Sequence, residues 1–100
     1  MLEIERLANM LKEAGIPFER DDEKQIAWPQ AERYPYMRRV HYPNNKDCVC
    51  SAIQGYGSYG NNENLIEIMG LAPEQSDGVA GYLTAENVFL RIKAHWENSK

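Results

Sequence analysis

The segment Gly55-Tyr56-Gly57-Ser58-Tyr59-Gly60 has the spacing G-x-G-x-x-G and lies between a stretch that predicts a strand and one that predicts a helix. In dinucleotide-binding folds this motif opens the first turn of a βαβ unit, and an acidic residue follows about 20 positions later. Here a large part of the chain precedes the motif, and the acids downstream, Glu74 and Asp77, lie among turn-forming residues. We therefore interpret the glycines as a bend that joins β structure to α structure, and the sequence predicts no cofactor.

Both ends of the chain have the periodicity of amphipathic helices. Near the N-terminus apolar residues recur at i, i+3, i+4 and i+7, and Gly15 followed by Pro17 is expected to end the helix. The charged residues of this segment, Glu3 among them, are expected to face solvent. Near the C-terminus, Thr84 fits the N-cap position of a second helix. The predicted apolar stripes are Ile4, Leu7, Ala8 and Leu11 in the first helix, and Val88, Phe89, Ile92 and Trp96 in the second.

The segments between these helices predict short strands. Pro17–Arg20 and Gln25–Trp28 are expected to form one hairpin around a polar turn, and Tyr36–Tyr42 and Cys48–Gln54 a second one. Residues 29–35 are polar and interrupted by prolines, which predicts an irregular connection. Short loops of this kind cannot carry a parallel crossover, so the sheet is expected to be antiparallel.

A short third helix is expected directly after the glycine bend. Asn61 or Asn62 fits its N-cap and Gly70 fits its end. Its apolar residues are Leu65, Ile66, Ile68 and Met69. The predicted fold class is therefore α+β: a small antiparallel sheet of three to four strands, with the N-terminal and C-terminal helices packed on one face, in a single domain over residues 1–100.

The composition is that of a folded, soluble chain. With 100 residues and 43% hydrophobic content, the chain is long enough for one modest core and too short for a catalytic domain beside a second domain. The apolar runs are too short to span a membrane, and the N-terminus has acids where a signal peptide has bases and an apolar block. We therefore expect a cytoplasmic protein with no membrane partner.

The net charge of -4 is unevenly distributed along the chain. Residues 33–46 include bases and no acid, whereas residues 47–90 include acids and no base. Such an asymmetry either guides a partner or corresponds to two solvated faces of a monomer.

The two cysteines, Cys48 and Cys50, lie two positions apart in a predicted strand, so their side chains are expected on one face. Without a secretion signal, free thiols are the expected state. Two buried, small apolar side chains are preferred over a metal site, because zinc takes four ligands and only His41 and His95 add good ones. A cysteine nucleophile paired with His41 across the hairpin is an alternative for which the strand register stays open.

The glycine bend is the leading candidate for a ligand site. Backbone N–H groups at a helix start bind anions, and tyrosines beside them stack on a base or ring. The bend lacks a Lys after its last glycine, so it is not a Walker A loop. A purely structural role, in which the glycines permit a sharp turn and the tyrosines cover an edge of the core, stays open. The candidate residues are Tyr56, Gly57, Ser58, Tyr59, Gly60 and Asn61.

A second candidate is the basic strand that contains Arg38, Arg39 and His41. In nucleic-acid interfaces, bases bind phosphate and nearby aromatic rings stack on unpaired bases. The acidic net charge argues against this partner, and in an alternating strand Arg38 faces one way while Arg39 and His41 face the other. Nucleic acid is therefore not the expected partner.

Three segments together resemble one group of bacterial sequences: Leu11–Glu19, Cys50–Leu71 and Gly81–Phe89. They are similar to short uncharacterised proteins of Gram-positive gut bacteria and their phages or prophages, over most of the chain. The resemblance implies a bacterial cytoplasmic setting and a mobile-element origin. It brings no activity and no catalytic residue.

These features together predict a small non-enzymatic binding or adaptor protein that recognises a protein partner or a second copy of itself. One alternative is a phosphate or nucleotide ligand at the loop formed by residues 55–62. The other is weak nucleic-acid binding through strand 38–42.

Overall fold

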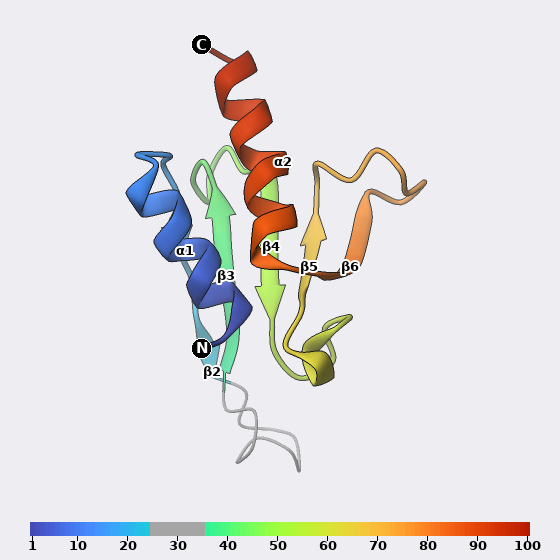
Figure 1. Ribbon diagram of the computed structural model, residues 1–100. Helices are drawn as coiled ribbons and strands as arrows, with labels where there is room; N and C mark the ends of the chain where they lie inside the picture. The colour runs from blue at the N-terminus through green and yellow to red at the C-terminus, as the bar shows by residue number, and fades with distance from the viewer. Residues whose placement is uncertain (25–35) are drawn as a thin grey trace.

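The computed structural model describes residues 1–24 and 36–100, and in it two helices cover one face of an antiparallel sheet (Figure 1). Helix α1 spans Glu3–Glu13 and helix α2 spans Ala85–Asn98. The predicted α+β class and the helices on one face are confirmed, but five strands follow one another across the sheet instead of three to four. In spatial order they are β1 (Glu19–Arg20), β3 (Tyr36–Tyr42), β4 (Cys50–Gln54), β5 (Ile66–Met69) and β6 (Val79–Leu83).

Strand β2 (Glu23–Lys24) continues the β1 edge along β3 in the same antiparallel register. The predicted turn is wrong at residues 23–24, which form β2, and residues 19–20 pair with β3. Asp21 and Asp22 interrupt the edge only briefly, so the chain keeps its register with β3. The expected strand at residues 25–28 and the expected irregular connection at residues 29–35 lie outside the described residues.

The hydrophobic core lies between the sheet and the helices. Alternation along β3, β4 and β5 places one set of side chains there, and Val40, Ala52 and Ile68 are at most 1% exposed. Both predicted helical stripes are confirmed. All four stripe residues of α1 are buried, as are Val88 and Ile92 of α2, and the two aromatic residues of the α2 stripe pack against this core while partly exposed.

The second predicted hairpin is confirmed as the antiparallel pair of β3 and β4. Strand β4 begins at Cys50, two residues later than predicted, after a turn that contains a cis peptide bond between Tyr42 and Pro43. The predicted N-cap of α2 is also confirmed, since the Thr84 side chain accepts a hydrogen bond from the Asn87 backbone N–H at 3.2 Å.

The predicted helix over residues 61–70 is wrong. Only Asn61–Glu63 form a short 3-10 turn, and Asn64 ends it with a left-handed φ of 57°. Residues Ile66–Met69 are strand β5, along which burial alternates. The period of two and the β-branched residues at the buried positions outweigh the helical spacing of the same apolar residues. With β5 in place, β6 becomes its antiparallel neighbour at the edge of the sheet.

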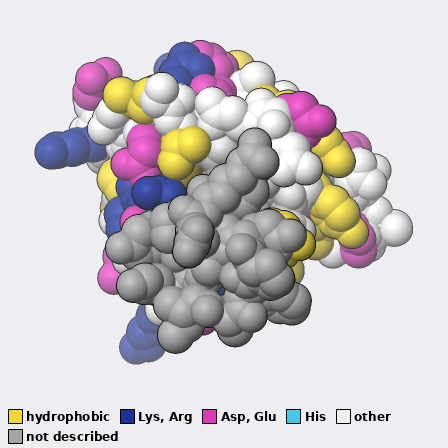
Figure 2. Space-filling view, turned by 90° about the horizontal axis from the view of Figure 1, so that it is seen from below, with side chains coloured by type: hydrophobic (Ala, Val, Ile, Leu, Met, Phe, Trp, Pro, Cys, Tyr) yellow, Lys and Arg dark blue, Asp and Glu magenta, His cyan; other side chains and the backbone are white. Residues whose placement is uncertain are grey.

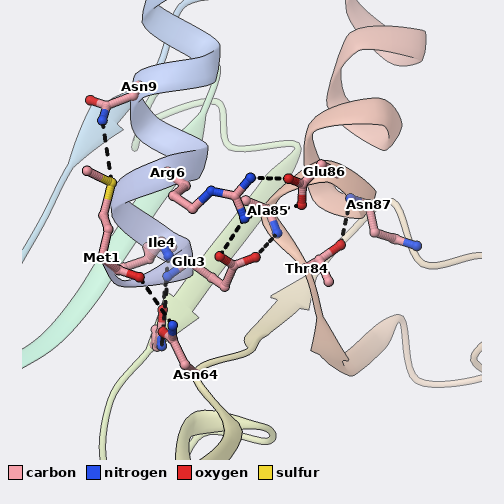
Figure 3. A network of polar contacts seen from close by, with 11 residues as sticks. Met1, Glu3, Ile4, Arg6, Asn9, Asn64, Thr84, Ala85, Glu86 and Asn87 are labelled. Atoms are coloured by element: carbon pink, nitrogen blue, oxygen red, sulfur yellow. Dashed lines mark hydrogen bonds and ion pairs between the residues drawn. The ribbon is translucent and has the colours of Figure 1, made fainter.

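A polar network joins the N-terminal ends of the two helices (Figure 3). The predicted exposure of Glu3 is wrong: the residue is buried, and its carboxylate accepts hydrogen bonds from the Ala85 backbone N–H at 2.9 Å and from Arg6 at 2.8 Å. Arg6 also forms an ion pair with Glu86 in α2. Glu3 is buried because it supplies an acceptor to the first turn of α2, where a helix favours negative charge.

Candidate binding site

The loop that we predicted to bind a ligand lines a cleft of about 320 Å³. The loop leaves β4 at the lower end of the sheet in Figure 1 and leads into β5. All the candidate loop residues line the cleft, and the structure adds Tyr82 from β6. We call this site the tyrosine cleft. Its lining residues are Tyr56, Gly57, Ser58, Tyr59, Gly60, Asn61, Asn62, Glu63 and Tyr82.

Two glycines allow the loop to lie directly against β6. A Cβ atom at Gly81 would lie 2.4 Å from the Cβ of Tyr59, and one at Gly60 would lie 2.9 Å from the Cα of Tyr82. The Tyr82 backbone N–H donates a hydrogen bond to the Tyr59 carbonyl oxygen at 3.2 Å. The glycines therefore serve close backbone packing, and this packing brings the two tyrosines together from distant parts of the chain.

Backbone N–H groups of the loop are largely used by the protein itself. The Gly55 N–H donates to the Ser58 hydroxyl at 3.0 Å, the Tyr59 N–H to the Glu67 carboxylate at 2.8 Å, and the Asn61 N–H to the Ser58 carbonyl at 3.2 Å. The loop leads into a strand, so the helix dipole on which the predicted anion site depended is missing there. The contribution of a helix dipole to anion binding is therefore absent from this loop.

The cleft lining contains one amide nitrogen without a hydrogen-bond partner in the described part of the chain and two exposed aromatic rings. The Nδ2 atom of Asn61 is buried and has no hydrogen-bond acceptor among the described residues. A buried donor without an acceptor costs about 1–3 kcal/mol. The side chains of Tyr59 and Tyr82 are 61% and 59% exposed, although aromatic rings of this size usually bury most of their surface.

The backbone of Tyr82 is held in an unusual conformation. Its φ of 59° is left-handed, which is rare for a bulky residue, and it lies next to a register shift in the β5–β6 pairing. Bulges and residues of this kind redirect side chains and persist only where their surroundings hold them. The fold therefore places the Tyr82 ring at the cleft at some cost in backbone strain.

Acidic groups dominate the surroundings of the cleft. Glu63 lines it, Glu67 contacts the Tyr59 N–H, and residues 47–90 contain no base. In Figure 2, which views the molecule from below, the right side shows hydrophobic and acidic side chains, whereas basic side chains lie on the left and at the top, where acidic ones lie as well. The electrostatic potential at the cleft therefore favours a cation over an anion.

The residues predicted for nucleic-acid binding do not form one surface. The Nε atom of Arg38 lies 3.7 Å from Glu5 of α1, whereas Arg39 forms an ion pair at 3.0 Å with Glu23 of β2. His41 is buried, with 8% of its surface exposed. Arg38 is thus directed toward the helix layer and Arg39 toward the β2 edge, each beside a carboxylate of this chain.

The two cysteines have different environments. Cys50 lies in the core, and burial raises the pKa of its thiol to about 12. Cys48 is exposed, and its Sγ lies 3.9 Å from the Nδ1 of His41. The prediction that both cysteines share one buried face is wrong, because Cys48 precedes β4 and does not follow its alternation.

His95 contacts the Tyr42 hydroxyl at 2.6 Å. In the described parts of the chain, no group of three or more His, Cys, Asp or Glu side chains is arranged to hold a metal ion.

A second hollow of about 520 Å³ lies between residues 71–74 and α2. Its charged side chains, Glu74 and Arg91, are hydrogen-bonded to each other at 3.0 Å, and Arg91 lowers the pKa of Glu74 to about 2. Because Glu74 and Arg91 already pair with each other, the tyrosine cleft with its two exposed tyrosine rings is the stronger candidate for a binding site.

Sequence reasoning identified the loop and missed Tyr82. The local signal was a tyrosine directly after a glycine, which does not by itself identify a neighbour. Tyr82 lies near the loop because β5 pairs with β6. This pairing could not be predicted once residues 61–70 were expected to form a helix.

None of the helices in residues 1–24 and 36–100 has the length and apolar character needed to cross a membrane. No family model, no curated protein and no solved structure matches the chain.

Proposed function

We propose that this chain is a non-enzymatic binding protein that recognises a protein partner by accepting one of its basic side chains in the tyrosine cleft. The observation that supports this most directly is the combination, in one cleft, of two exposed tyrosines and nearby carboxylates with no base. Lys and Arg side chains are attracted to the faces of aromatic rings and to carboxylates.

The alternative ligands fit these surroundings less well. A phosphate or nucleotide would approach Glu63 and Glu67 without a compensating base in the lining of the cleft. A nucleic acid could contact Arg38 or Arg39 but not both, because their side chains point in different directions, and each lies beside a carboxylate.

The test is a titration of the ¹⁵N-labelled protein, followed by two-dimensional NMR, with a short Gly-Arg repeat peptide. The matched control peptide carries citrulline, the neutral isostere of arginine, and a third titration uses ATP. We expect the arginine peptide to shift the amides of Tyr59, Gly60 and Asn61, and the citrulline peptide to have a much smaller effect. Shifts at these amides with ATP alone would replace this proposal with a nucleotide site.

Two variants locate the binding. We expect Tyr82→Ala to weaken binding of the arginine peptide by about fivefold to thirtyfold, the range of a cation–π contact of about 1–2 kcal/mol. Leu90→Ala removes a side chain of α2 that is as exposed, at 62%, and lies outside the cleft lining, so it should leave binding unchanged. Equal losses in the two variants would contradict the assignment of the cleft.

A second copy of the chain is a specific case of a protein partner, since the bases of residues 38–46 carry the complementary charge. Sedimentation velocity at several salt concentrations tests this case. Association that weakens with added salt would support it, and a monomer at high protein concentration throughout would assign the cleft to a different protein.

A further inference from the structure

Three chemically active side chains meet on the sheet face opposite the helices. The Nδ1 of His41 lies 3.9 Å from the Sγ of Cys48, and the Nε2 of His41 lies 3.6 Å from a carboxylate oxygen of Asp21. His41 belongs to β3, Cys48 precedes β4, and Asp21 follows β1, so the strand pairing brings them together. A thiol, an imidazole and a carboxylate in this order are the groups of a base-assisted nucleophile.

The burial of these groups suits that chemistry. His41 is 8% exposed, which fixes its ring, whereas Cys48 is exposed and open to a reactant. The Nε2 of His41 is buried and has no hydrogen-bond partner among the described residues, and the Asp21 carboxylate provides a negative charge beside it. We assign the ring proton to Nε2 on this basis, which leaves the lone pair of Nδ1 directed at the thiol.

Other charged groups surround His41 on the same face. Arg39 lies two positions away along β3 and contacts both Glu23 and Asp21, at 3.0 Å and 4.0 Å. Glu19 is the residue opposite His41 across the β1–β3 pairing, and its carboxylate accepts a hydrogen bond from the Asn45 backbone N–H. Arg39 therefore balances part of the negative charge around the imidazole.

We propose that Cys48 is a site of covalent thiol modification by low-molecular-weight disulfides, with His41 as the base and Asp21 as the group that positions His41. In the reaction the Cys48 sulfur attacks one sulfur of the disulfide RSSR, and its proton moves to Nδ1 of His41. The S–S bond of RSSR breaks as the new S–S bond forms, and the leaving thiolate takes the proton. Cys48 is oxidised to a mixed disulfide, and one half of the reactant is reduced to RSH.

The resting thiol requires this base. Partial burial raises the pKa of Cys48, so at neutral pH the group is a thiol and not a thiolate. A thiol with a raised pKa is a strong nucleophile once its proton is removed. The reactivity of Cys48 near neutral pH therefore depends on proton transfer to His41, and this dependence can be measured.

The experiment follows the reaction of the full chain with dithiodipyridine by the absorbance of the released thiopyridone, with mass spectrometry to locate the modified cysteine. We expect His41→Gln to lower the rate at Cys48 at neutral pH by about a hundredfold, the low end of the contribution of a general base. In this variant the rate should rise about tenfold per pH unit, as free thiolate formation does, whereas the wild-type rate should depend on pH less steeply.

Two controls separate this role from a structural one. His95→Gln removes the other histidine, which contacts Tyr42, and should leave the rate at Cys48 unchanged. Cys50 is 1% exposed and should stay unmodified, so its labelling would report unfolding of a variant. If His41→Gln unfolds, Asp21→Asn provides a second test, with an expected loss of severalfold. Unchanged rates and pH profiles in a variant whose Cys50 stays protected would overturn the proposal.

Discussion

Asn64 supports the N-terminal end of α1 from a distant part of the chain. Leu2, at the N-cap of this helix, provides no side-chain hydrogen bond. The Asn64 side-chain oxygen instead accepts from the Glu3 backbone N–H at 3.1 Å and from the Gln54 amide at 2.7 Å, and its nitrogen donates to the Met1 carbonyl at 3.2 Å (Figure 3). Asparagine also tolerates the left-handed φ of 57° that this position requires.

We expect Asn64→Ala to lower the free energy of unfolding by about 2–3 kcal/mol. The loss combines a helix cap, an unpaired amide of Gln54 and the tolerance of asparagine for the left-handed backbone, which alanine lacks. Urea denaturation followed by circular dichroism measures the change. Asn62→Ala is the matched control at an exposed neighbouring asparagine, and it should stay within about 0.5 kcal/mol of wild type. Similar losses in both variants would refute this role of Asn64.

The β5–β6 hairpin depends on a close backbone contact at Gly70. Its φ is 93°, and a Cβ atom there would lie 2.1 Å from the Val49 carbonyl oxygen, just before β4. Its N–H donates to the Gly78 carbonyl at 2.9 Å and closes the connection between the two strands. Gly78 also has a left-handed φ, of 73°, but no atom of the described residues would lie within 4 Å of a Cβ added there.

These two glycines give a matched pair of substitutions. Gly78→Ala should cost only the left-handed conformation, about 1–2 kcal/mol. Gly70→Ala adds a clash with backbone that cannot move without displacing β4, so its loss should exceed about 3 kcal/mol. Chemical denaturation of both variants under the same conditions measures the difference. Equal losses would show that the contact with Val49 is easily relaxed.

The elements that the sequence predicted well are those whose signals are local. The stripe of α1, the Thr84 cap and the β3–β4 hairpin each depend on residues close together in the chain. The prediction of a helix over residues 61–70 was wrong because the four apolar residues within positions 65–69 fit both the helical and the strand period, and pairing with β4 decides between them. The contact of Glu3 with Ala85 and the position of Tyr82 beside the loop join residues far apart in the sequence, so no local pattern predicts them.

For the whole molecule, ion pairs hold α2 at both of its sides. Glu86, in its first turn, pairs with Arg6 of α1, and Arg91 pairs with Glu74 in the connection between β5 and β6. Arg91 also donates to the Leu71 carbonyl at 2.8 Å. These contacts connect segments that the strand ladder does not join directly, so their loss should loosen the helix layer over the sheet.

This arrangement predicts loss of stability in acid. The hydrogen bond from Arg91 lowers the pKa of Glu74 from 4.5 to about 2. The pKa of Glu86 is lowered as well, by a hydrogen bond from the backbone N–H of Glu86 itself and by Arg6. A carboxyl group whose pKa is lower in the folded state stabilises the fold above its unfolded-state pKa, and this contribution disappears as the pH falls through the folded-state value.

The melting temperature of the wild type should therefore decline as the pH falls from about 5 toward 2, the window set by the two pKa values of Glu74. Glu74→Gln should melt lower than wild type at neutral pH, because the charge that binds Arg91 is gone. The melting temperatures of the two proteins should converge as the pH falls below about 2, where Glu74 becomes protonated in both the folded and the unfolded wild type. Thermal unfolding followed by circular dichroism at stepped pH measures this convergence.

Glu13→Gln, at the exposed end of α1, is the control. Its melting temperature should run parallel to that of wild type over the whole pH range, because the substitution removes a carboxylate that lies in solvent. A constant offset between Glu74→Gln and wild type from neutral pH to acid would mean that the contact with Arg91 stabilises the fold through packing and not through charge.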